Sequence, residues 1–134
     1  LIIAAGGAFK QVLIDSGVGD TVKEFSARFD LSPLFLGWLI AALIRVTLGS
    51  ATVAGLTAAG IVLPLVGSGV SAELMVLSIG AGSLMFSHVN DAGFWMFKEY
   101  FNLSLKQTFG TWTIMESLVS VLGLLGVLLI NQFL

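Results

Sequence analysis

The sequence predicts an all-α integral membrane protein. Of its 134 residues, 57% are hydrophobic and only 10% are charged, and the mean hydropathy is +1.02. Soluble domains carry a charge at roughly 25% of their positions, so this composition is typical of a chain whose solvent is the bilayer. Long apolar runs separated by short polar breaks favour helices, because a helix satisfies its own backbone hydrogen bonds inside lipid.

The composition also excludes several other classes of protein. The chain has no cysteine and one histidine, which leaves no disulfide framework and too few ligands for a zinc site. We therefore expect no metal and no organic cofactor. A net charge of −2 offers no basic surface for nucleic acid. The chain begins at Leu1, inside an apolar run with no basic stretch before it, which predicts a fragment with a cut helix rather than a signal peptide.

Two segments precede the first long apolar region. Residues 1–16 are expected to form the end of a membrane helix, which loses its apolar character at Lys10 and Asp15. Residues 20–30 alternate apolar and charged positions at helical spacing, as in a short helix lying on the membrane surface. A solvated loop helix explains residues 20–30 equally well, and neither interpretation implies chemistry.

Residues 33–66 are predicted to form a re-entrant hairpin. Ser32 and Pro33 are typical of a helix start, and the apolar run that follows is interrupted by the small residues GSATVAG at positions 49–55. Two full crossings need about 40 residues plus a turn, more than residues 34–66 supply. A hairpin that enters and leaves on one side fits this length, while two tight crossings are the alternative.

Residues 73–98 are predicted to form a broken transmembrane helix. A helix over residues 74–97 would be about 36 Å long, enough to cross the hydrocarbon layer. The polar stretch SHVNDAGFW at positions 87–95 would begin well below the surface, where ionisable groups usually mark a substrate or ion path. We therefore expect a partly unwound elbow at residues 87–93. The alternative is a surface loop between two short helices.

The last transmembrane helix is predicted over residues 108–134. Trp112 near its start suits the membrane interface. Glu116, in its first turns, is expected at the headgroup level, from which it could also reach the interior.

Polar groups at the hairpin tip suit an anion. Gly49, Ser50 and Thr52 offer hydroxyls and backbone N–H groups where the second arm begins, and the positive end of that helix favours a carboxylate. Arg45 lies about one turn earlier and needs a partner at such depth. Asp91, Glu116 or an anionic substrate could balance its charge.

The elbow carries the groups that could move protons. Burial disfavours the charged form of a carboxyl group, which would let Asp91 exchange protons, and His88 titrates near neutrality by default. In the alternative interpretation, His88, Asn90 and Asp91 only hydrogen-bond the frayed backbone. Ser87, His88 and Asp91 also match the residue types of a hydrolytic triad, but adjacent Ser and His side chains diverge and no nucleophile elbow is present. We therefore do not expect an enzyme.

Four separated blocks resemble the gluconate permease family, bacterial gluconate:proton symporters of the inner membrane. The blocks are GGAFKQVLIDSGVGD (6–20), GSATVAGLTAAGI (49–61), SHVNDAGFW followed by KEYFN (87–102), and TWTIMES (111–117). The resemblance implies a multi-pass secondary transporter built from two inverted repeats. This chain would be its C-terminal part, one of the two halves, and the N-terminal half would be missing. A homo-oligomer is left open.

The resemblance also implies a substrate site. A sugar acid such as gluconate would face Ser50, Thr52, Ser87, His88, Asn90 and Asp91, with the proton as coupling ion. In related dicarboxylate transporters the hairpin tip carries Ser-Asn-Thr, whereas Gly49 to Thr52 here lack the Asn. That departure disfavours a sodium site and agrees with proton coupling. The rival predictions are a transporter of another small carboxylate or amino acid, a channel, and a membrane scaffold that transports nothing.

Overall fold

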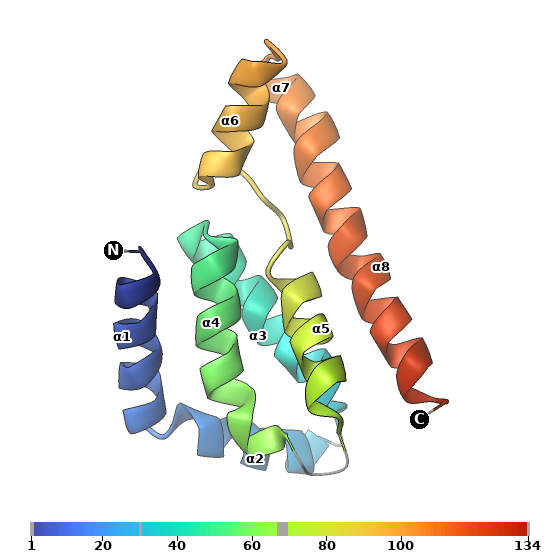
Figure 1. The fold of residues 1–134 in the computed structure, drawn as a ribbon. Helices are drawn as coiled ribbons and strands as arrows, with labels where there is room; N and C mark the ends of the chain where they lie inside the picture. The colour runs from blue at the N-terminus through green and yellow to red at the C-terminus, as the bar shows by residue number, and fades with distance from the viewer. Residues whose placement is uncertain (1, 30, 67–69, 134) are drawn as a thin grey trace.

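The predicted all-α class is confirmed by a computed structural model, which describes residues 2–29, 31–66 and 70–133 (Figure 1). Over these residues the chain is helical, without β-strands. Residues 1, 30 and 134, which limit three of the predicted segments, lie outside the described residues.

The first two helices form an L-shaped unit. Helix α1 (Ile2–Asp15) ends at a turn in which Gly17 adopts a left-handed φ of +76°, and α2 (Val18–Phe29) follows at once. Helix α2 lies across the base of the molecule, where it meets the end of α4 (Figure 1). The interfacial position of this helix stays a prediction.

Helices α3 (Pro33–Leu48) and α4 (Ala51–Val62) form a tight antiparallel hairpin joined by Gly49 and Ser50 alone (Figure 1). Helix α4 continues as a short 3₁₀ turn (Leu63–Leu65). The two helices are about 24 Å and 18 Å long at 1.5 Å per residue, so each is shorter than a hydrocarbon layer of about 30 Å. Their re-entrant character stays a prediction.

A helix break lies between α5 (Ala72–Gly82) and α6 (Ala92–Tyr100) (Figure 1). The intervening residues 83–91, called the elbow from here on, start four residues earlier than the sequence predicts. Phe86 in the elbow has a φ of +49°, a left-handed conformation that is unusual for a bulky residue. The helical break therefore includes locally strained backbone.

The C-terminal part of the chain is one long helix with a wider turn near its start. Helix α7 (Leu105–Thr108), a π-helical turn (Phe109–Thr113) and α8 (Ile114–Asn131) run on without interruption. Together they form Leu105–Asn131, in which an 18-residue stretch has a mean hydropathy of 2.2. Among the described residues this is the one helix long and apolar enough to cross a membrane.

Helices α3, α5 and α8 are tied together by polar contacts as well as by apolar packing. The Ser78 hydroxyl of α5 donates to the Leu34 carbonyl of α3, and the Trp38 indole N–H donates to Ser120 Oγ of α8 at 3.0 Å. The surrounding core is apolar and draws on α3, α4, α5 and α8: Leu34, Leu36, Ala41, Ala58, Val62, Leu65, Leu74, Met75, Ile79 and Val127. This packing fixes the hairpin relative to the elbow.

The closest approach of α5 to α3 gives a prediction for Gly82. A Cβ atom at Gly82 would lie 2.3 Å from the Trp38 carbonyl oxygen, whereas one at Gly80 of the same helix would meet nothing within 4 Å. We expect Gly82→Ala to destabilise the protein by about 1–3 kcal/mol through overpacking. Thermal unfolding in detergent should then show a lower midpoint for Gly82→Ala than for wild type. The midpoint should not fall for Gly80→Ala, because alanine has the higher helix propensity. Equal midpoints for the two variants would contradict this packing.

Candidate functional site

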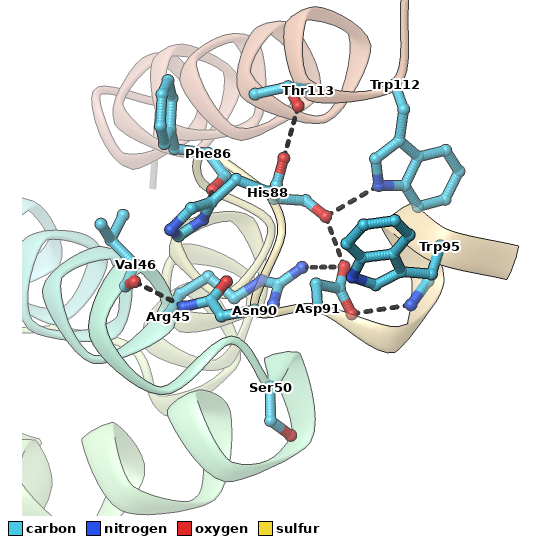
Figure 2. A network of polar contacts seen from close by, with 12 residues as sticks. Arg45, Val46, Ser50, Phe86, His88, Asn90, Asp91, Trp95, Trp112 and Thr113 are labelled. Carbon is cyan, nitrogen blue, oxygen red and sulfur yellow. Dashed lines mark hydrogen bonds and ion pairs between the residues drawn. The ribbon is translucent and has the colours of Figure 1, made fainter. Parts of the chain in front are cut away.

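A buried ion pair joins the hairpin to the elbow. Arg45 lies in the last turn of α3, and its side chain is only 3% exposed. Its Nη2 atom is 2.6 Å from Oδ2 of Asp91, whose side chain is 15% exposed. The pair is drawn near the centre of Figure 2. Two segments 46 residues apart in the chain thus meet at one charge pair among apolar helices.

Asp91 also starts helix α6. It occupies the N-cap position, and its Oδ1 accepts the backbone N–H of Gly93 at 2.9 Å. A carboxylate at a helix N-terminus is stabilised by the free N–H groups and by the helix dipole. The Asp91 side chain therefore caps helix α6 and also pairs with the Arg45 guanidinium.

A second set of contacts holds Asp91 from the side of the last helix. The Ser87 hydroxyl donates to Oδ2 of Asp91 and accepts the Trp112 indole N–H at 2.7 Å. The Thr113 hydroxyl donates to the Ser87 carbonyl at 2.5 Å (Figure 2). Trp112 and Thr113 are neighbours in the π-helical turn, and π-turns occur often at functional sites. The turn places both side chains on Ser87.

These contacts change the expected environment of Asp91. The sequence suggests a carboxyl that burial alone would push toward its neutral form. In the structure Arg45, Ser87 and the Gly93 N–H all donate to this carboxyl. Such donors favour the charged form, so Asp91 is held as a carboxylate in this conformation.

The hairpin tip packs backbone to backbone against the elbow. Gly49 has a φ of +72°, and a Cβ atom there would lie 2.2 Å from the Asn90 carbonyl oxygen. The Asn90 amide donates to the Val46 carbonyl at 2.9 Å, which satisfies one of the free carbonyls at the end of α3. Glycine at the tip is therefore required by both conformation and space.

Other predicted site residues are placed less centrally. The Ser50 hydroxyl accepts the Val53 N–H as the N-cap of α4 at 3.3 Å, and in Figure 2 it points away from the ion pair. Thr52 lines a mostly apolar groove of about 300 Å³ between α4 and α5. Ser87 is fully buried beneath Asp91. The structure thus joins Arg45 to part of the elbow, whereas the hydroxyls of Ser50 and Thr52 at the hairpin tip take no part in the Arg45–Asp91 contact.

Among the described residues, the His88 ring makes no hydrogen bond with the Ser87 hydroxyl. Its Nδ1 atom is 3.0 Å from the Phe86 carbonyl oxygen, and its ring packs near the Phe86 ring. The Ser87 hydroxyl is engaged by Asp91 and Trp112 instead. A Ser–His pair for hydrolysis is absent from this part of the described chain.

Sequence reasoning missed two residues of the site. The sequence predicts the membrane interface for Trp112 and indicates no role for Thr113. The signal available was the TWTIMES block, which contains both residues, but a π-turn cannot be inferred from its composition.

Buried charge paired between a helical hairpin and a broken helix is typical of membrane transport proteins. The chain belongs to the GntP family of permeases, whose family model matches residues 1–133. Membership of this family makes the chain part of a membrane protein, and the curated relatives are named as permeases or transporters. No solved structure matches it.

Curated relatives match almost the whole chain. It is 60% identical to the gluconate permease of Bacillus subtilis (strain 168) over 98% of its length. It is 58% identical to the Gnt-II system L-idonate transporter of Escherichia coli (strain K12) over 99%. A high-affinity gluconate transporter of the same E. coli strain is 55% identical over 98%. The chain covers 30% of the length of each of these relatives.

The contact between Thr113 and Ser87 gives a second prediction. Thr113→Val removes the donor and leaves a buried carbonyl unsatisfied, which should cost about 1–3 kcal/mol. Thr111→Val is the matched control, because the Thr111 hydroxyl donates within its own helix, to Gln107. The chain has no cysteine, so labelling of a single cysteine at exposed Val89 reports on elbow opening. We expect faster labelling with Thr113→Val only, and equal rates in both variants would contradict the role of Thr113.

Proposed function

We propose that this chain is the C-terminal transport region of a bacterial inner-membrane secondary transporter. It would carry gluconate or a similar small sugar acid together with protons, by alternating access. The names of the relatives support the substrate class, since they include gluconate permeases and an L-idonate transporter. The partner half of the site would come from an inverted repeat elsewhere in a longer protein.

One observation supports an anion as the substrate. Arg45 uses only Nη2 in its ion pair, and its buried Nε and Nη1 atoms have no hydrogen-bond partner among the described residues. Buried donors are normally satisfied, so a fixed cation with spare donors suits a ligand with acceptor oxygens. The carboxylate of a sugar acid supplies such oxygens.

The start of α4 supports the same substrate. Its 12 residues begin directly after Ser50, and the first N–H groups of a helix have no partner within it. Together with the helix dipole they attract an anion. Gly49 holds this helix end against Asn90. In the proposal, Gly49 and the hydroxyls of Ser50 and Thr52 bind the sugar acid on the tip side.

The remaining predicted residues line the elbow side. Ser87, His88 and Asn90 would complete the substrate site in another state of the transport cycle, when the elbow moves relative to the tip. Asp91, helped by His88, would be the proton-sensitive element. Its protonation would weaken the pair with Arg45 and free the guanidinium for the substrate. Proton uptake would thereby favour binding of the anion.

Substitution of Asp91 tests the proposal. We expect Asp91→Asn to reduce gluconate accumulation driven by a pH gradient about tenfold, equivalent to about 1.4 kcal/mol, because Arg45 loses its counter-ion and the site loses a proton acceptor. The measurement is uptake of labelled gluconate by vesicles containing the complete transporter, with the gradient imposed or collapsed. Asp15→Asn, at an exposed position in α1, is the control and should accumulate gluconate normally.

Three outcomes of the uptake measurement support or contradict different parts of the proposal. Loss of accumulation with retained gluconate binding supports the coupling role of Asp91. Accumulation equal to wild type removes Asp91 from the proton path. A wild-type transporter that accumulates no gluconate under either condition overturns the substrate assignment.

A further inference from the structure

Glu116 is a second carboxyl group that faces the ion pair. It lies in the first turn of α8 and is half-buried. Residues three and four apart share one face of a helix, so Glu116 lies between Thr113, which contacts Ser87, and Ser120, which contacts Trp38 of α3. That face is turned toward the elbow and α3. This position fits the interior alternative that the sequence leaves open for Glu116.

The Glu116 carboxyl interacts electrostatically with both Arg45 and Asp91. Few other ionisable groups are near it in sequence or fold: α3 contains only Arg45, and α5 contains only Glu73, in its first turn at the far end from Gly82. His88 is the remaining titratable group of the elbow. Among the described residues, no hydrogen-bond donor reaches the Glu116 carboxyl.

We propose that Glu116 is a proton-carrying residue of this site, and that its ionised form disfavours binding of the anionic substrate at the spare nitrogens of Arg45. The inference rests on the proposed proton-coupled transport. It departs from that proposal on one point: Glu116 carries the moving proton in place of Asp91, and Asp91 stays ionised as the fixed counter-ion of Arg45. The loss of accumulation expected for Asp91→Asn then comes from the missing counter-ion alone. Two observations point to this division: Asp91 receives three hydrogen-bond donors, and Glu116 receives none from the part of the chain that the structure describes.

The charges of the site explain the coupling. With Arg45 positive and both carboxylates ionised, the trio has a net charge of −1, and an incoming anion meets repulsion at low dielectric. A proton on Glu116 makes the trio neutral. The substrate carboxylate can then approach Nε and Nη1 of Arg45, which are buried and unpartnered within the described chain, without that repulsion. The proton enters from water on one side and leaves to water on the other, and only an O–H bond forms and breaks.

Glu116→Gln mimics the protonated state permanently and tests this assignment. In the complete transporter we expect exchange of labelled for unlabelled gluconate to continue, since exchange needs no net proton movement. Accumulation driven by a pH gradient should fall to the level seen with the gradient collapsed. Glu99→Gln, which alters an exposed carboxyl paired with Lys98, should behave as wild type.

The pH dependence of gluconate binding separates Glu116 from Asp91. Deprotonation of Glu116 weakens binding, so wild-type affinity should fall by up to about tenfold per pH unit above its titration point. Glu116→Gln should bind equally well across that range. Asp91→Asn should keep the wild-type slope, because Glu116 is still present.

Two results would overturn the inference. One is a Glu116→Gln transporter that accumulates gluconate with the pH gradient as wild type does. The other is loss of both exchange and accumulation in Glu116→Gln at a normal membrane level, with Glu116→Asp equally inactive, because Glu116 would then serve binding or folding. Absence of gradient-driven uptake in wild type would instead refute the proposed function.

Discussion

The rest of this structure depends on one requirement, the need of a buried arginine for a counter-ion. Arg45 is fixed at the end of α3, inside a layer of apolar helices, and an unpaired charge there would cost several kcal/mol. Asp91 meets the requirement only if the chain stops being helical before it and restarts at it. The elbow and the start of α6 follow from that requirement, since the same carboxylate caps α6 and pairs with Arg45.

The π-helical turn supplies the contacts that hold Ser87 against Asp91. Ser87 contributes its hydroxyl to Asp91 and must itself be held, and the wider turn aims Trp112 and Thr113 at its two polar groups. A change of this turn to regular α-helix would alter the contacts of Ser87 and, through Ser87, those of Asp91. The elbow is thus linked to the long C-terminal helix by side chains, while the hairpin is linked to the elbow by charge and by the close approach of Gly49.

Much of this arrangement is predictable from the sequence, and there are physical reasons why the other features are not. Composition predicts the all-helical membrane class, and the single arginine in an apolar run predicts a buried pair. The choice between Asp91 and Glu116 as its partner depends on where α8 starts, which periodicity does not fix. The residue type of Ser50 predicts a substrate contact, which stays a prediction, but it does not indicate that this hydroxyl also caps α4. Local hydrogen bonds of this kind compete with ligand binding and are decided by backbone geometry.

The central claim is that Arg45 and Asp91 act as one unit, and a double-mutant cycle tests it most directly. The free energy of unfolding would be measured in the complete protein for Arg45→Gln, Asp91→Asn and the pair of changes together. Each single change leaves a buried charge without its partner, so we predict about 3–5 kcal/mol of destabilisation for each. The double variant should lose much less than the sum. Additive losses would mean that the two residues act independently and would contradict the account.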